Sequence, residues 1–182
     1  MVQVLSNIEV LLLSIINEKP SYAYEIDKAI DMRNIRDWAR IGVASIYQVL
    51  KRLEEKNLVY SKNEKEGRMP ERKRYYVTYD GKAALIEASK RLLSNFERYY
   101  LDLNVGLEAS DLLTPDEMAG CIVKRLGKVQ TNIKRMQAMY ADEKVVAFKK
   151  KAVIGNLIRL REAEEHFLQE FLQLLSTTDD DQ

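Results

Sequence analysis

Positively charged and hydrogen-bonding side chains gather in two short segments that are close together in the sequence. In the first, residues 44–57, apolar residues recur at helical spacing on one side only. The other side offers side chains that could bind a nucleic acid: Ser45, Tyr47, Gln48, Lys51 and Arg52. Gln48 is the best candidate for reading a base, because a glutamine amide can make a bidentate contact with adenine. For a lone helix, an ordinary solvated face is the commoner explanation of this pattern.

The second segment, residues 67–74, has the composition of a basic turn. Four of its eight residues are cations, and a glycine and a proline beside them favour a hairpin loop. The cations are Arg68, Arg72, Lys73 and Arg74. A basic hairpin tip can lie along phosphates or enter the minor groove, whereas Glu64, Glu66 and Glu71 keep a solvated charged loop as the alternative. A helix and a turn of this kind, so close in the chain, together favour binding to duplex DNA.

The elements that must position these segments follow from capping residues and apolar spacing. Ser6 and Glu9 form a capping box for a first helix, and Ser21 can cap a second. A third helix and two β-like runs follow, at residues 44–57, 58–61 and 73–78. Three helices and a two-stranded hairpin are the order of a winged helix-turn-helix. We therefore expect a mainly α protein with an N-terminal winged helix-turn-helix and a two-stranded wing.

The second half of the chain has the pattern of long helices. Thr78 can cap a fourth helix that runs to about residue 103, and a capping pattern at 114–117 starts another after the interrupted stretch 102–113. A last helix covers about residues 143–176. Apolar residues in the last two helices recur at spacings close to a heptad, and their faces are too wide to be covered within one chain. A homodimer is the expected solution.

These patterns predict three regions. Residues 1–85 form a winged-helix DNA-binding domain, residues 86–176 a helical dimerisation domain, and residues 177–182 a flexible acidic tail.

Several motifs occur in the order and spacing of a known family. They are Pro20 to Ile26 (PSYAYEI), Ser45 to Glu54 (SIYQVLKRLE), Leu58-Val59, Pro70 to Thr78 (PERKRYYVT) and Gly81. Over roughly residues 5–85 the chain resembles the PadR family of bacterial transcriptional regulators, and its later helices resemble the longer-tailed, virulence-activator-like branch. In two positions the chain departs from the family, with Ala23 for a usual glycine and Gln48 for a usual proline. Because Gln48 lies on the DNA-facing side, base preference transfers less well than fold.

The resemblance implies a sequence-specific, DNA-binding transcriptional regulator that works as a homodimer. Members of the family are usually repressors, and some release DNA when a small aromatic or drug-like molecule binds. In this setting Ser45, Tyr47, Lys51 and Arg52 belong to the recognition helix, and residues 72–74 to the wing. The alternative function is that of an adaptor whose winged helix binds protein and not DNA.

A small aromatic ligand would need a pocket among the later helices. Phe96, Tyr100, His166 and Phe167 lie on helices that we expect to meet near the dimer seam, where they could line a site for a flat molecule. Core packing is the alternative for an aromatic row at helical spacing.

Composition excludes several other classes of protein. The net charge is only +1, but residues 40–82 hold 11 Lys and Arg against 6 Asp and Glu, where a DNA-facing surface needs them. A single Cys121 and a single His166 cannot build an internal disulfide or a Cys/His zinc site, and isolated glycines form no phosphate cradle. We expect no metal, no cofactor and no enzymatic activity. The longest apolar run is too short to span a bilayer, which predicts a cytosolic protein without a membrane partner.

Overall fold

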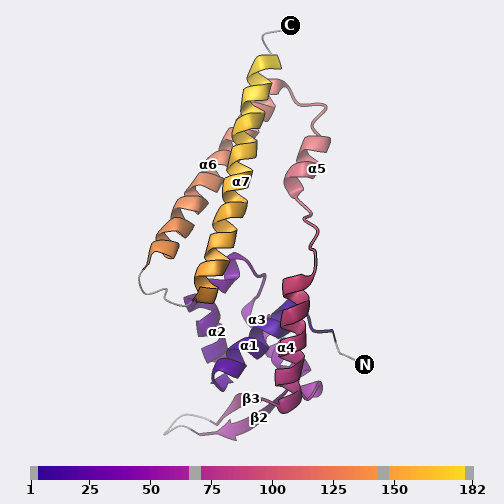
Figure 1. Cartoon of the computed structure of the whole chain (residues 1–182), viewed down its shortest axis with the longest axis vertical. Helices are drawn as coiled ribbons and strands as arrows, with labels where there is room; N and C mark the ends of the chain where they lie inside the picture. The colour runs from indigo at the N-terminus through magenta and orange to yellow at the C-terminus, as the bar shows by residue number, and fades with distance from the viewer. Residues whose placement is uncertain (1–3, 66–70, 143–147, 179–182) are drawn as a thin grey trace. The chain divides into compact units, whose positions relative to one another are not determined.

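The computed structural model describes residues 4–65, 71–142 and 148–178, and the chain divides into two compact units, residues 1–98 and 99–182 (Figure 1). The helices of the first unit are α1 (Asn7–Glu18), α2 (Ala23–Met32), α3 (Val43–Glu55) and α4 (Tyr79–Ser94), with a 3-10 turn at Ile35–Asp37. Its strands are β1 (Ser21–Tyr22), β2 (Val59–Glu64) and β3 (Arg72–Val77). The second unit contains α5 (Asp102–Glu108), α6 (Pro115–Ala141) and α7 (Phe148–Thr178). The expected winged helix followed by long helices is confirmed.

Helices α1 and α3 form the centre of the first unit. The predicted capping box begins α1: Ser6 Oγ accepts a hydrogen bond from Glu9 N, and Glu9 Oε2 accepts one from Ser6 N at 2.8 Å. Both helices bury a stripe at helical spacing and share one core, whose fully buried members include Leu12, Ile16, Ile46, Leu50 and Leu53. Burial of α3 on this side leaves its other side to solvent.

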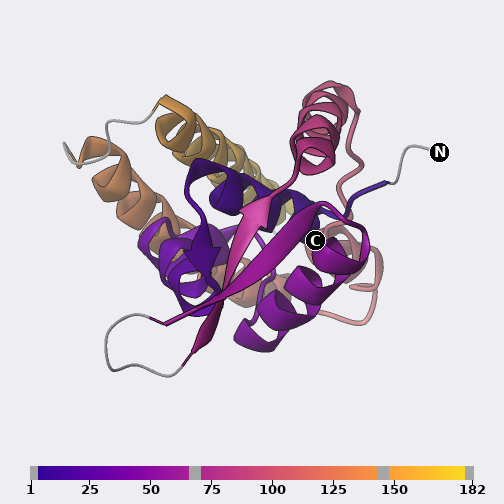
Figure 2. The same ribbon diagram turned by 90° about the horizontal axis from the view of Figure 1, so that it is seen from below.

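The two-stranded wing that the sequence predicts is present as β2 and β3, and β1 adds a third antiparallel strand to the sheet in the order β1-β3-β2 (Figure 2). The extra strand corrects the expected start of α2. Ser21 pairs with Tyr75 in the sheet and donates its hydroxyl to the carbonyl of Lys19, so it cannot cap the helix. The N-cap is Tyr22, whose backbone N–H donates to the carboxylate of Glu25 at 2.9 Å. Pairing with β3 holds residues 21–22 extended, and the helix starts later than predicted.

The turn between α3 and β2 fixes where the hairpin leaves the helix. Asn57 adopts a left-handed conformation with φ 56°, and the N–H of Leu58 donates to the carbonyl of Leu53 at 2.9 Å. This is a Schellman end, with an asparagine in the place usually taken by glycine. The carbonyl of Leu58 then accepts hydrogen bonds from the backbone N–H and the hydroxyl of Thr78, the N-cap of α4. Gly81 belongs here because a Cβ at that position would lie 2.0 Å from the Leu58 oxygen.

Helix α4 ends at Ser94, well before residue 103, where the sequence predicts its end. Ala88 is its last buried residue, and Leu93 and Phe96 are 89% and 90% exposed. Because most helices in proteins are stabilised by tertiary packing of an apolar face, loss of that packing removes the support for further turns. The stretch 102–113, predicted as an interruption, contains the separate short helix α5.

In the second unit, α6 and α7 lie side by side (Figure 1). Thr114 caps α6 as predicted, with Pro115 at the first helical position and Glu117 completing the capping box. The two helices bury a stripe of the expected apolar row together with two residues of α7: Ile122, Val129, Ile133, Met136, Ile154 and Leu168. Polar bonds flank this core, among them Arg125 to Glu164 at 2.6 Å.

Two expectations for the C-terminal half lie partly outside the described residues. The sequence places the start of the last helix at about residue 143, but residues 143–147 are not described. The same holds for residues 179–182 of the expected tail. No helix in the described part of the chain combines the length and the apolar character needed to cross a membrane.

Glu9 generates a prediction about stability and pH. This carboxylate is 3% exposed, and its Oε1 accepts a hydrogen bond from Lys56 Nζ at 2.7 Å, which ties α1 to the end of α3. Burial alone would raise the pKa of Glu9, but hydrogen bonds from Lys56 and Ser6 outweigh burial, and the pKa lies below 4.5. A carboxyl with a lowered pKa in the folded state stabilises the protein above about pH 4.5, and that contribution is lost as pH falls through the folded-state pKa.

We therefore expect Glu9→Gln to lower the free energy of unfolding by about 1–3 kcal/mol at neutral pH, since Lys56 loses a charged acceptor. The deficit should be smaller at an acidic pH below the lowered folded-state pKa of Glu9, where the parent carboxyl is itself protonated. Urea unfolding followed by circular dichroism measures both values. The matched control is Glu87→Gln, which affects an exposed pair with Lys90 and should change little at either pH. An equal deficit at both pH values would contradict the assignment.

Candidate nucleic-acid interface

The solvent side of α3 carries the side chains that the sequence selects for DNA contact. Tyr47 is 57% exposed, Gln48, Lys51 and Arg52 are exposed, and Ser45 is partly buried. Lys51 lies 3.8 Å from Glu55, but with 79% of its side chain exposed, this pair competes weakly with another anion. These five residues therefore share one accessible face of a rigid helix.

The start of α3 also suits an approaching phosphate. Unlike α1, α2, α4 and α6, this helix has no acidic residue in its first turn, and Gly42 provides no side-chain cap. The first amides of a helix lack intrahelical partners and carry the positive end of its dipole. An anion at the N-terminus of α3 would meet that partial charge without a neighbouring carboxylate.

The pleat of the hairpin divides the wing cations between two faces of the sheet. In β3, Lys73, Tyr75 and Val77 lie on one face, which packs toward the core and α3, while Arg72, Arg74 and Tyr76 lie on the other. On the first face Lys73 Nζ lies 3.9 Å from Glu54 of α3, and Ser61 of β2 donates its hydroxyl to the same carboxylate at 2.5 Å. Glu54 thus joins α3 to both strands of the wing.

On the second face the two arginines lie against tyrosines. The guanidinium carbon of Arg72 is 5.3 Å from the centre of the Tyr24 ring, and that of Arg74 is 4.4 Å from the centre of the Tyr22 ring. Arg72 is exposed, whereas 25% of the Arg74 side chain is exposed and its Nη1 lies 3.3 Å from Glu64 Oε2. The three cations 72–74 therefore have different surroundings. Arg68, the fourth predicted wing cation, lies outside the described residues.

Two tyrosines of β3 have raised pKa values. Burial raises the pKa of Tyr75 above 10, with Glu54 and Tyr47 adding to the effect. The hydroxyl of Tyr76 donates a hydrogen bond to Glu64, and this bond, together with burial, raises the pKa of Tyr76 in spite of the nearby Arg74. Both phenols therefore stay protonated at physiological pH, and Tyr76 acts as a donor within the wing.

Sequence reasoning missed the side chains that hold the wing in place. They are Glu54 and Ser61 on the α3 side, and Tyr22, Tyr24, Tyr60, Lys62, Glu64 and Tyr76 on the other. A signal was present, because residues 60, 62 and 64 and residues 72, 74 and 76 alternate along two paired strands and thus share one face. The contribution of Tyr22 could not be read in this way, since it depends on the unpredicted strand β1.

The four residues of the expected ligand pocket are not brought together within either unit. Phe96 lies in the first unit, at the edge of a recess of about 670 Å³ lined mainly by Ile8, Leu11, Trp38, Leu92 and Phe96. In the second unit, Tyr100 is 85% exposed and His166 lies 3.3 Å from Glu170 on the solvent side of α7. Phe167 stacks on Phe171, with ring centres 6.0 Å apart.

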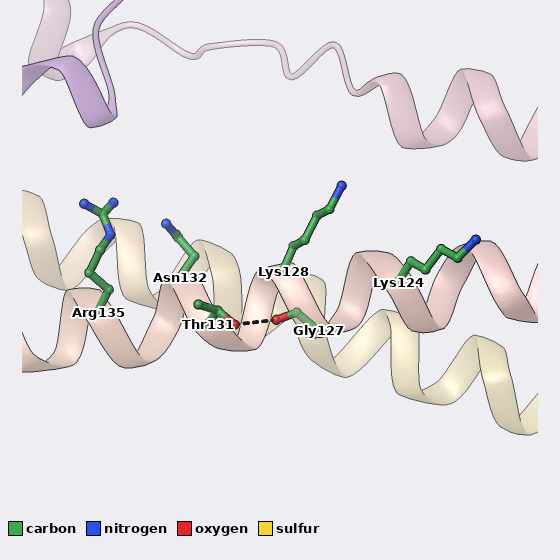
Figure 3. A pocket seen from close by; sticks show the side chains of 6 residues that line it. All are labelled: Lys124, Gly127, Lys128, Thr131, Asn132 and Arg135. Carbon is green, nitrogen blue, oxygen red and sulfur yellow. Dashed lines mark hydrogen bonds between the residues drawn. The ribbon is translucent and has the colours of Figure 1, made fainter.

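A second hollow, of about 450 Å³, lies on the solvent side of α6 (Figure 3). Its lining is polar and largely basic: Lys124, Gly127, Lys128, Thr131, Asn132 and Arg135. Thr131 donates its hydroxyl to the carbonyl of Gly127 at 2.8 Å. This surface lacks the apolar walls that a flat aromatic molecule requires, so the recess near Trp38 is the better candidate for such a ligand. Within the described residues, no group of His, Cys, Asp and Glu side chains could hold a metal ion.

Comparison with known proteins relates this geometry to a family. Residues 12–87, which contain α3 and the hairpin, match the Transcriptional regulator PadR-like family. Among curated protein sequences, none matches the chain.

Solved structures share the fold over most of the chain. The structure of Bacillus subtilis PadR in complex with operator DNA has a TM-score of 0.80 at 17% identity, with 93% of this chain and 99% of that chain covered. PadR of the same organism in complex with p-coumaric acid has a TM-score of 0.75 at 15% identity, covering 93% and 98%. A PadR-like regulator of Bacillus cereus has a TM-score of 0.67 at 17% identity, also covering 93% and 98%. Residues 12–87, with their winged helix, are therefore similar to the PadR-like family of transcriptional regulators, and the chain shares the fold of solved PadR structures.

Proposed function

We propose that the protein is a homodimeric repressor that reads a two-fold-related DNA site and releases it when a small aromatic acid binds. One observation carries the DNA-binding part: an exposed polar face of α3 stands beside a basic hairpin that Glu54 ties to the same helix. In helix-turn-helix docking, the N-terminal part of the recognition helix reaches base edges and flanking cations contact phosphates.

Each side chain then has a role in the complex. Ser45, Tyr47 and Gln48, near the N-terminal end of α3, approach the base edges, and Gln48 is suited to an adenine. Lys51 and Arg52 of α3, with Arg72 and Lys73 of the wing, neutralise phosphates.

Since a DNA-bound repressor acts where the chromosome is, we place the protein in the cytosol. For its functional domains we keep the three predicted regions: a winged helix at residues 1–85, a helical dimerisation domain at 86–176 and a tail at 177–182.

The double variant Lys51→Ala/Arg52→Ala tests the docking. We expect weaker binding to every duplex, including random sequence, because a phosphate-binding cation contributes without regard to sequence. A plot of log affinity against log salt has a negative slope, and its magnitude, here called the salt slope, should fall by about 0.9 for each phosphate that a protomer no longer neutralises. Fluorescence anisotropy with a labelled random duplex over a salt series measures it.

The matched control for this double variant is Lys124→Ala/Lys128→Ala, which removes two exposed lysines from α6 and should leave the slope unchanged. An α3 variant as tight and as salt-dependent as the parent would refute the docking. A parent that binds no duplex at any salt would favour the protein-binding adaptor.

The dimer is supported by a row of apolar side chains on α7 that the chain leaves in solvent. Val153, Leu160, Phe167 and Leu174 are spaced by seven residues and are between 37% and 64% exposed. Such heptad spacing keeps a row on one side of a helix and is typical of a seam between two helices. A second copy can cover the row on both chains at once through a two-fold axis.

Analytical ultracentrifugation at micromolar concentration should therefore show twice the chain mass of 21.1 kDa. We expect Leu160→Lys to shift the protein toward the monomer, because a charge would be buried in the seam. Gln169→Lys is the matched control and should leave the dimer intact, because this exposed position is about two and a half turns further along and lies on the opposite side of the same helix. A parent that sediments at 21.1 kDa would rule out the dimer.

Ligand release is supported by the recess of the first unit, which combines apolar walls with one cation, Arg40, and one carboxylate, Glu97. Trp38, Leu92 and Phe96 offer surfaces for a ring, and Arg40 at the same recess can pair with a carboxylate. Bacillus subtilis PadR, with the same fold, has been seen with p-coumaric acid, a molecule of this chemical class.

We expect p-coumaric acid to change the fluorescence of Trp38, the chain's one tryptophan, and to lower duplex affinity over the same concentration range. The fluorescence signal must be corrected for absorption by the ligand. Leu92→Ala should weaken the fluorescence response because it removes part of the wall, whereas Leu93→Ala, which does not line the recess, should not. Absence of both the signal and the release at millimolar ligand would exclude an aromatic acid as inducer.

A further inference from the structure

Arg74, in β3, is held by partners on the two neighbouring strands of the sheet. Its guanidinium lies over the ring of Tyr22 in β1, which is 3% exposed, and its Nη1 lies 3.3 Å from Glu64 in β2. The Nε atom of Arg74 is buried and has no hydrogen-bond partner among the described residues, so the stacking and the Nη1 contact are what hold the group. Arginine combines stacking on an aromatic face with directed N–H donors, which a flexible lysine cannot reproduce. The side chain therefore joins β1, β3 and β2 on the sheet face that points away from α3.

Glu64 is the second member of this arrangement. Besides its contact with Arg74, its carboxylate accepts a hydrogen bond from the hydroxyl of Tyr76 in β3. Tyr76 in turn stacks on Tyr60, with ring centres 5.2 Å apart, and Lys62 Nζ lies 5.5 Å from the centre of the Tyr76 ring. The carboxylate is therefore committed to groups of the wing, and the positive charge of Arg74 is balanced locally.

We propose that Arg74 and Glu64 are positioning residues, which set the wing for DNA without contacting it, and that Arg72 and Lys73 are the phosphate-binding cations of this strand. The neighbours supply the contrast. Lys73 has 57% of its side chain exposed, and its Nζ lies 3.9 Å from Glu54. Arg72 is exposed and lies over the ring of Tyr24. Arg74 has 25% exposed and is engaged by both a carboxylate and a buried ring.

The physical reason lies in the balance of charge and ordering. A phosphate would have to displace Glu64 from Arg74 and leave that carboxylate, still negative, beside the DNA backbone. Keeping the pair intact instead holds strand β3, which carries Arg72 and Lys73, against β1 and β2 before DNA arrives. Binding then does not have to order the wing, and preorganisation of this kind raises affinity by lowering the entropy lost on association.

The inference rests on the proposed DNA docking, and the salt dependence of binding separates the two roles. Arg74→Ala should weaken binding to a random duplex by about two- to tenfold, the cost of ordering one or two side chains on association, with no change in the salt slope. Arg72→Ala, the matched control on the same strand and face, should lower the slope by about 0.9 per protomer. Arg74→Lys keeps the charge but cannot stack and fork in the same way, so we expect it to bind like Arg74→Ala.

Glu64→Gln gives a test of opposite sign. If Arg74 is a positioning residue, removal of its charged partner weakens DNA binding even though a negative charge is removed. If Arg74 contacts phosphate, the same substitution frees the guanidinium and strengthens binding. The double variant Glu64→Gln/Arg74→Ala should bind no worse than Arg74→Ala alone, because both changes break one interaction.

All measurements use the full chain, and circular dichroism unfolding establishes that each variant is folded at the assay temperature. Should Arg74→Ala not fold, Arg74→Lys and Glu64→Gln decide the question by themselves. A lower salt slope in Arg74→Ala, recovery of binding in Arg74→Lys, or equal or tighter binding in Glu64→Gln would overturn the inference. A parent without salt-dependent duplex binding would instead overturn the docking.

Discussion

The backbone carbonyl of Leu58 is the point at which α3, the wing and α4 meet. It follows directly on the left-handed turn at Asn57 that ends α3, and it accepts the hydrogen bonds of Thr78, which caps α4. Gly81 lets α4 approach this carbonyl, because any side chain there would overlap its oxygen. The two chain ends of the hairpin are thus held together by backbone bonds next to the core. Everything that the wing does depends on this closure.

From that junction the pleat of the sheet assigns each wing residue to a side. The face with Lys73 and Ser61 turns to α3, where Glu54 holds it, and the opposite face carries the tyrosines and arginines. The neighbouring cations Arg72, Lys73 and Arg74 therefore have different partners, although they carry the same charge. A wing positioned from both sides presents its cations beside α3 at a defined angle. This geometry suits simultaneous contact with a groove and its phosphates.

In the C-terminal unit, too, each helix buries one side and leaves the other exposed. Helices α6 and α7 cover one another along a buried stripe that includes Val129 and Leu168, and bonds such as that from Arg125 to Glu164 flank this stripe. A pair of helices cannot bury more than the sides that face each other, so the heptad-spaced row of α7 from Val153 to Leu174 remains at least 37% exposed. The excess of basic residues lies in the first unit, in residues 40–82, and not in these C-terminal helices.

The sequence by itself determined the elements whose causes are local. Caps at Ser6, Thr78 and Thr114, the apolar side of α3 and the basic turn are all decided by residues within a few positions of one another. The order of elements and the family motifs then led to a winged helix, because few folds place a basic hairpin directly after a third helix.

Only the tertiary structure decided what depends on distant partners. Strand β1 exists because β3, far later in the chain, pairs with it, and Ser21 loses its capping role for the same reason. Helix α4 ends at Ser94 because no residue beyond Ala88 is fully covered within its unit, which no local propensity reveals. The separate surroundings of Arg72, Lys73 and Arg74 likewise arise from pairing across three strands. Charge and spacing identified the cations as a group, and long-range contacts gave each of them its own environment.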